Sequence, residues 1–204
     1  NQNLGSQAED YKKKVSDNCK LLLGCNYALL RPEFSKMREH ALKKRKSTKE
    51  IKNILVSFGG SDIDNITYDI LQQINDRFNV VVILGGASPH NIMIKDYVKD
   101  KNIEVIISPD NMVELMLNTD LAIGAGGSTS WERCCMALPS IVIILADNQK
   151  KIGENLSSAG ATITLKDDIN MGQNIKQSIE YLMQDRESYE KMSLNASKIC
   201  DGNG

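Results

Sequence analysis

Two glycine-rich stretches, each placed after an apolar run, hold residue types that can bind phosphate. In the longer one, residues 121–123 are apolar, and glycines and hydroxyls follow at Gly124, Gly126, Gly127, Ser128, Thr129 and Ser130. Glycine lets the backbone approach a ligand closely, and the first N–H groups of a helix have no partner inside the helix. Together with the helix dipole they attract anions. This order of strand, glycines and helix predicts phosphate or nucleotide binding, with a strand–helix turn that needs glycine for packing as the alternative.

The shorter stretch spans residues 57–62. Its Gly59 and Gly60 allow a tight turn toward a phosphate, to which Ser61 can donate a hydrogen bond. By itself this stretch fits a plain turn equally well. Two such loops side by side would suit a diphosphate. Glu132, one turn inside the expected second helix, is then placed to accept hydrogen bonds from hydroxyls of the ligand.

Polar residues also follow a later apolar run, residues 141–145. Asn148 and Gln149 come next and precede a helical pattern. Their side chains could cap that helix or contact the sugar or base of a ligand, and the local sequence leaves both interpretations open.

The pattern of the whole chain predicts the elements that position these residues. Short β-branched runs alternate with helical stretches. We expect strands at residues 53–57, 80–84, 103–107, 121–123, 141–145 and 161–165. We expect helices at residues 33–46, 66–78, 91–101, 111–118, 130–137, 149–159, 172–183 and 186–199. Apolar strands alternating with helices predict an α/β fold with a doubly wound, mostly parallel, six-stranded Rossmann-like sheet.

This topology predicts where a ligand binds. In a doubly wound sheet the first and fourth strands are neighbours, and ligands bind beyond their carboxyl ends. Both glycine stretches follow these two strands. They are therefore expected to flank one crevice, with Asn148 and Gln149 facing it from the next strand.

The start of the chain differs in composition from the rest. Residues 1–19 are polar and include three consecutive lysines, whereas residues 20–204 carry the alternating pattern. We expect residues 1–19 to be a linker from a preceding domain and residues 20–204 to be the nucleotide-binding domain. Residues 20–23 form a short apolar run that is compatible with a further strand.

Composition argues against several classes of function. The formal net charge of −1 does not favour nucleic acid or a membrane surface as a partner, and the apolar runs are too short to span a bilayer. Five irregularly spaced cysteines and two histidines do not indicate metal or disulfides, so we expect no cofactor and a cytoplasmic location. Gly124-Ala125-Gly126 begins like a dinucleotide fingerprint, but Thr129 replaces its third glycine and it follows the fourth strand, which disfavours a dehydrogenase.

Taken in order, the motifs resemble a known family. These motifs are residues 27–34, residues 57–62, residues 125–132 and residues 147–149. They are similar to those of the UDP-sugar hydrolases of pseudaminic acid biosynthesis and of their spore-coat polysaccharide relatives. Those proteins share a two-domain glycosyltransferase-B fold with the peptidoglycan N-acetylglucosaminyltransferase. The resemblance covers the chain from about residue 20 onward and corresponds to the nucleotide-binding, C-terminal half of that fold.

The resemblance implies a role for each candidate residue. The phosphates would lie against Gly59, Gly60, Ser61, Gly126, Gly127, Ser128 and Thr129. Glu132 would accept hydrogen bonds from the ribose, and Asn148 and Gln149 would lie near the donor sugar. Tyr27 and Leu29 belong to a segment that would border the uracil pocket. The implied ligand is UDP or a UDP-sugar.

The resemblance also implies a reaction. The hydrolases cleave the anomeric C–O bond of UDP-2,4-diacetamido-2,4,6-trideoxy-β-L-altropyranose and release UDP and the free sugar. Their proposed base is a histidine in an N-terminal glycine-rich loop, and no such loop is present here. We therefore expect this chain to bind UDP or a UDP-sugar without turning it over, with the other domain acting in cis. The alternatives are the donor-binding domain of a glycosyltransferase and a non-enzymatic domain that responds to nucleotide sugars.

Overall fold

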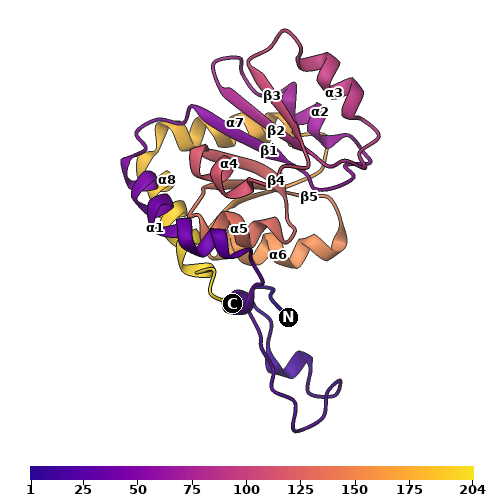
Figure 1. The fold of residues 1–204 in the computed structure, drawn as a ribbon, viewed down its shortest axis with the longest axis vertical. Coiled ribbons are helices and arrows are strands. Elements are labelled where there is room, and N and C mark those ends of the chain that lie inside the picture. Colours follow the sequence, from indigo (N-terminus) through magenta and orange to yellow (C-terminus); the bar gives the residue numbers. More distant parts are fainter.

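The computed structural model describes residues 1–204 and is built on one parallel sheet. Its six strands lie in the order β3-β2-β1-β4-β5-β6 (Figure 1). Their bounds are β1 Asn53–Ser57, β2 Asn79–Leu84, β3 Ile103–Ile107, β4 Leu121–Ala125, β5 Ser140–Ile144 and β6 Ile163–Lys166. All five pairings are parallel. The predicted fold class is confirmed.

Helices cover both faces of the sheet. Their bounds are α1 Pro32–Ser47, α2 Ile66–Leu71, α3 Asn91–Val98, α4 Met112–Asn118, α5 Thr129–Cys135, α6 Asp147–Ser158, α7 Met171–Gln184 and α8 Arg186–Ile199. One face packs against α2, α3 and α7, and the other against α1, α4, α5 and α6. Figure 1 shows these two helical layers on either side of the strands. No helix combines the length and the hydropathy that a membrane span needs.

Alternation along the strands divides the core between the two faces. In β1, Ile54 and Val56 pack into the first layer, whereas Leu55 packs into the second. This alternation is the period-2 geometry of a strand that is buried on both sides. In the four inner strands, β2, β1, β4 and β5, polar residues are consequently confined to the strand ends, and these ends form two different edges of the sheet.

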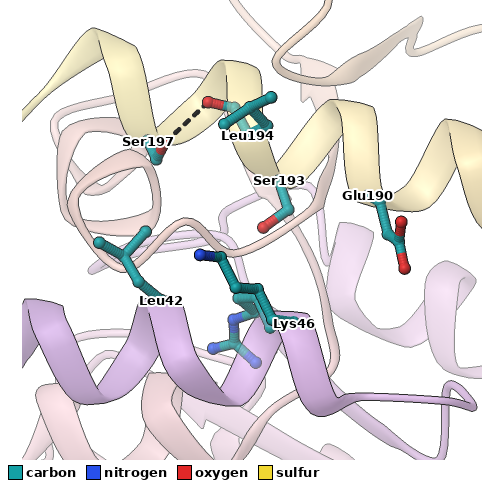
Figure 2. A pocket seen from close by; sticks show the side chains of 7 residues that line it. Leu42, Lys46, Glu190, Ser193, Leu194 and Ser197 are labelled. Atoms are coloured by element: carbon teal, nitrogen blue, oxygen red, sulfur yellow. Dashed lines mark hydrogen bonds between the residues drawn. The ribbon is translucent and has the colours of Figure 1, made fainter.

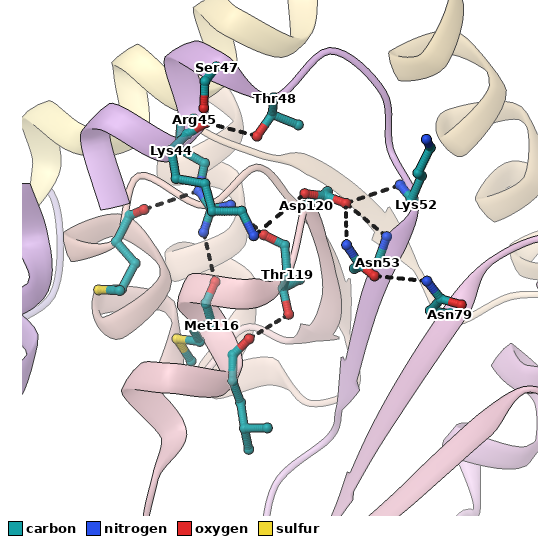
Figure 3. A network of polar contacts seen from close by, with 12 residues as sticks. Lys44, Arg45, Ser47, Thr48, Lys52, Asn53, Asn79, Met116, Thr119 and Asp120 are labelled. Carbon is teal, nitrogen blue, oxygen red and sulfur yellow. Dashed lines mark hydrogen bonds and ion pairs between the residues drawn. The ribbon is translucent and has the colours of Figure 1, made fainter. Parts of the chain in front are cut away.

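The amino edge of the sheet is closed by polar contacts. Asn102 donates to Asn79 (2.7 Å), Asn79 to Asn53 (3.0 Å) and Asn53 to the Asp120 carboxylate (3.0 Å). Asp120 also accepts from the backbone N–H groups of Lys52 (3.1 Å) and Asn53 (2.8 Å). This chain of amides, part of which Figure 3 shows, links the starts of β3, β2, β1 and β4.

A buried arginine completes the same edge. The Arg45 guanidinium donates to the carbonyls of Met116 (2.7 Å), Met136 (3.4 Å) and Thr119. Tyr189 donates to the Asp120 carbonyl at 2.8 Å. Helices α1 and α8 are thereby tied to the sheet.

Two of the predicted elements are wrong. Residues 20–23 form no strand, because they lie away from the sheet and the Leu22 carbonyl accepts instead from the Asn1 ammonium (2.9 Å). The predicted helix 66–78 ends at Leu71, since the chain then enters turns, one of which the Asn75 side chain holds by accepting from Arg77 N (3.0 Å). Figure 1 shows the indigo start of the chain projecting from the rest. Its assignment to a linker at residues 1–19 stays a prediction.

Candidate functional site

The loops that follow β1 and β4 meet at the carboxyl edge of the sheet. Ser57, the last residue of β1, pairs with Gly124 of β4. The predicted neighbourhood of the first and fourth strands is therefore confirmed. Gly126 lies against the next loop as well, because a Cβ atom there would be 3.4 Å from Gln149 Cβ. Three of the predicted segments therefore converge at the carboxyl edge of the sheet.

The β4–α5 loop presents unused donors. The N–H groups of Gly127 and Ser128 make no hydrogen bond within the chain. A Cβ atom at Gly127 would meet nothing within 4 Å, so the space above this backbone is open. The Ser128 side chain is exposed and Thr129 begins α5. Backbone donors with free space beside them are what a phosphate requires.

The β1–α2 loop presents a second set of donors. Gly59 has a φ of +90°, a conformation that glycine adopts at no steric cost. The N–H groups of Gly59, Gly60 and Ser61 have no partner within the chain. Gly85 packs closely against Gly60, since a Cβ atom on Gly85 would lie 1.9 Å from the Gly60 carbonyl oxygen.

Asp62 belongs to the fold rather than to the chemistry of the crevice. Its carboxylate accepts from the N–H groups of Ile66 (2.9 Å) and Thr67 (3.1 Å). The N-terminus of α2 is thus already occupied by an acid, and only the loop donors are available to a ligand. Asp62 therefore stabilises the first turn of α2.

Glu132 is half-buried on α5, and its carboxylate makes no hydrogen bond or ion pair within the chain. Burial raises the pKa of Glu132, and the nearby guanidinium groups of Arg31 and Arg133 partly offset this effect. Its carboxylate oxygens are accordingly free to accept hydrogen bonds from a ligand.

The neighbourhood of Glu132 contains residues that the sequence interpretation missed. Arg31 donates to the Asp110 carbonyl at 2.9 Å, which joins the segment before α1 to the β3–α4 loop. A cavity of about 420 Å³ lies there, lined by Arg31, Glu33, Lys36, Met37, Asp110, Asn111, Val113 and Glu114. The sequence held a signal for this region, since the β3–α4 loop also follows the carboxyl end of a strand. It was overlooked because it has no glycine pair.

Asn148 and Gln149 lie in the first turn of α6, which begins two residues earlier than predicted. Gln149 Oε1 accepts from Leu145 N at 3.2 Å, so this side chain holds the β5–α6 turn. Asn148 is exposed and its side chain has no partner. Of the two, Asn148 is the one free to contact a ligand.

The structure does not join Tyr27 and Leu29 to the glycine loops. Their side chains are exposed, and Leu29 N donates to Gln2 Oε1 at 3.2 Å. Arg31, two residues further along, is the residue of this segment whose charge acts on Glu132. The prediction that Gly124 belongs to the glycine loop is wrong, because Gly124 lies within β4. There a Cβ atom would be 2.3 Å from the Ser57 oxygen, so glycine is required for packing.

Another concavity lies between α1 and α8 and is not a competing site (Figure 2). Ser197 donates to the Leu194 carbonyl and Ser193 to the Ala137 carbonyl, both at 2.7 Å. The hydroxyls of this concavity are therefore already used within the chain.

Comparison with known proteins agrees with this geometry. The fold and the crevice define a doubly wound α/β domain with a site at its switch point. Residues 34–202 match the glycosyltransferase family 28 C-terminal domain, and the chain belongs to this family. The resemblance predicted from the motifs is confirmed at the level of the family.

Relatives of this chain include proteins with different activities. It is 28% identical over 203 residues to the spore coat polysaccharide biosynthesis protein SpsG of Bacillus subtilis, covering 93% of this chain and 57% of that protein. It is 29% identical over 164 residues to the UDP-N-acetylglucosamine–N-acetylmuramyl-(pentapeptide) pyrophosphoryl-undecaprenol N-acetylglucosamine transferase of Leuconostoc citreum, covering 72% and 44%. It is 24% identical over 168 residues to the UDP-2,4-diacetamido-2,4,6-trideoxy-beta-L-altropyranose hydrolase of Campylobacter jejuni, covering 81% and 59%.

A solved structure shares the fold. MurG of Acinetobacter baumannii superposes with a TM-score of 0.60 at 16% identity, covering 78% of this chain and 49% of that one. The chain spans about half the length of these curated relatives.

Proposed function

We propose that this domain binds the UDP part of a UDP-sugar donor in a glycosyltransferase-B-type enzyme of cell-surface or spore-coat polysaccharide synthesis. The observation that carries the proposal is the convergence of two loops with unused N–H groups, residues 59–61 and residues 127–128, at the edge where β1 meets β4. Membership of family 28 supports it.

Each part of the ligand has a complementary surface. A diphosphate accepts hydrogen bonds from the free N–H groups of the two loops, and the hydroxyls of Ser61, Ser128 and Thr129 are further donors. The ribose hydroxyls donate to Glu132. The base occupies the cavity beside Arg31, and the donor sugar extends toward Asn148.

Glu132 is suited to this role because it has no partner within the chain. A carboxylate that accepts two ribose hydroxyls must be ionised, and burial raises its pKa. The ligand supplies the hydrogen bonds that the protein lacks. Affinity for the nucleoside is then expected to depend on the charge of Glu132.

The reaction of the whole protein is also a proposal. In a transferase an acceptor alcohol attacks the anomeric carbon, whereas in a hydrolase water attacks, and UDP leaves in both cases. Several relatives are N-acetylglucosamine transferases, which favours transfer. The similarity to the hydrolase covers 81% of this chain, which keeps hydrolysis as the second candidate. In either case a general base for the attacking group is expected from the other half of the enzyme.

A calorimetric titration tests the proposed binding. UDP should bind the wild-type chain, and NAD should not. Glu132→Ala should lower the affinity for UDP by about tenfold or more. Glu154→Ala, which removes an exposed carboxylate further along α6, serves as the control and should bind like wild type. Absence of UDP binding, or preference for NAD, would contradict the proposal.

The two reactions are separated with the full-length protein. UDP release from a UDP-sugar that requires an added acceptor indicates a transferase. Release at the same rate without any acceptor, together with free sugar, indicates a hydrolase.

A further inference from the structure

A fully buried cation lies directly beneath the proposed phosphate loop. Arg133, on α5, is 3% exposed. Its Nη2 atom donates to the Ala125 carbonyl (2.8 Å) and to Ser130 Oγ (2.9 Å). These two acceptors lie on either side of the β4–α5 loop. The guanidinium therefore bridges the end of the strand and the first turn of the helix.

No carboxylate pairs with this cation at close range, and the Glu132 charge acts on it only from further away. No carboxylate lies within 4.0 Å of it, and its Nε atom is buried without a hydrogen-bond partner. Burial lowers the pKa of Arg133 to about 10, so the group is still protonated at neutral pH. A buried charge that is neither paired nor fully hydrogen-bonded destabilises the fold that contains it.

The strand beneath it is shaped to hold this group. A Cβ atom at Gly124 would lie 2.6 Å from Arg133 Nη1. The glycine within β4 thus leaves room for the guanidinium as well as for the Ser57 carbonyl. The missing side chain of Gly124 therefore provides the space in which the positively charged Arg133 lies at the carboxyl edge of the sheet.

We propose that Arg133 is a positioning residue whose missing close counter-charge is supplied by the diphosphate of the ligand. It engages the Ala125 carbonyl and the Ser130 hydroxyl, which leaves the N–H groups of Gly127 and Ser128 directed at the ligand. Its charge adds positive potential under the loop, and protein rather than salt solution lies around it, so screening is weak. This inference rests on the proposed binding of UDP.

The proposal distinguishes Arg133 from an arginine that serves the fold alone. Replacing a buried charge that has no close ionic partner with an apolar side chain of similar length relieves the cost of burying the charge but removes two hydrogen bonds, so the net change in fold stability is expected to be small. The same replacement should weaken the binding of a diphosphate and leave the binding of an uncharged nucleoside almost unchanged. Only a residue that acts on the phosphate gives this combination.

The test uses thermal unfolding and titration with UDP, uridine and pyrophosphate. Arg133→Met should weaken the binding of UDP and pyrophosphate about tenfold and change the binding of uridine less than about twofold. It should change the melting temperature less than the Arg45 control does, because it removes two hydrogen bonds together with a buried charge. Arg45→Met is the matched control, because Arg45 is equally buried but donates to three carbonyls at the opposite edge. It should lower the melting temperature and leave the affinity for UDP unchanged.

A second neutral variant keeps the proposal testable if Arg133→Met does not fold. Arg133→Gln retains a donor for the Ala125 carbonyl without the charge, and it should show the same selective loss of UDP and pyrophosphate. Wild-type affinity for UDP in either variant would overturn the role of Arg133 while the binding of UDP stands. An equal loss of UDP and uridine with a lower melting temperature would also overturn it. Absence of UDP binding by the wild type would overturn both proposals.

Discussion

The two edges of the sheet use similar residues in opposite ways. At the amino edge, Asp120 accepts three hydrogen bonds and Arg45 donates to three carbonyls. At the carboxyl edge, Glu132 has no partner and Arg133 keeps an unpaired Nε atom. One acid and one arginine are saturated by the chain itself, and the other pair is left incomplete.

The difference separates stability from binding. Leaving a buried polar group without a partner costs free energy, so an edge that serves the fold alone is expected to be satisfied internally. Under the proposed function, the ligand would supply the missing partners of the unsatisfied groups at the other edge. The comparison is open to experiment on either edge.

The largest effect is expected at the amino edge. Asp120→Ala would leave two backbone N–H groups and the Asn53 amide without an acceptor, and should lower the free energy of unfolding by about 3 kcal/mol. Denaturant unfolding measures this change. Affinity of the folded variant for UDP should be unchanged, and a selective loss of UDP binding would break the division between the edges.

A matched pair of glycines tests the carboxyl edge. Gly124→Ala would place Cβ against the Ser57 oxygen and Arg133, and overpacking of this kind should cost about 2 kcal/mol. Gly127→Ala meets nothing within 4 Å and should leave stability unchanged while weakening UDP. Thermal unfolding and titration of both variants check the pair. Equal stability of the two would contradict the packing role given to Gly124.

The pH dependence of nucleoside binding tests Glu132. The carboxylate must be ionised to accept the ribose hydroxyls, and its pKa is raised by burial. Affinity for uridine, which carries no phosphate, should therefore fall as the pH is lowered, beginning above the usual range of a glutamate. In Glu132→Gln the affinity should be lower at neutral pH and flat across this range.

The raised pKa of Glu132 also affects the free energy of unfolding, with a pH dependence opposite to that of uridine binding. The folded state holds the Glu132 proton more tightly than the unfolded state, so this group favours folding at low pH. That contribution is lost as the pH rises through the raised pKa. Glu132→Gln should remove this component from the pH dependence of unfolding, and an unchanged profile would count against the burial of the charge.

The smallest effect is expected in the exposed part of the amide chain. Asn79→Ala removes one donated and one accepted hydrogen bond and should cost about 0.5–1 kcal/mol. Affinity for UDP should not change. A cost as large as that of Asp120→Ala would mean that the chain of amides acts as one unit, which a double variant measured by denaturant unfolding would resolve.

The sequence alone predicted the architecture and most of the crevice. Apolar strands alternating with helical stretches indicated a parallel sheet, and the order of the strands placed the two glycine loops side by side, as the structure shows. The roles of the individual residues stay predictions until a ligand is measured. These inferences succeeded because strand period, turn chemistry and the switch-point rule depend on neighbouring residues and on the order of elements.

Other features were decided only by the tertiary structure. Gly124 was read as part of a loop, yet it lies in a strand where it faces Arg133 and the Ser57 carbonyl. Arg31 donates to the Asp110 carbonyl across 79 residues of sequence. Residues 20–23 form no strand, because they lie away from the sheet and the Leu22 carbonyl accepts from the Asn1 nitrogen. Burial and missing partners, which distinguish Arg133 from Arg45, arise from contacts between distant segments. The local sequence encodes backbone preference, but only packing decides which charges lose water and which find partners.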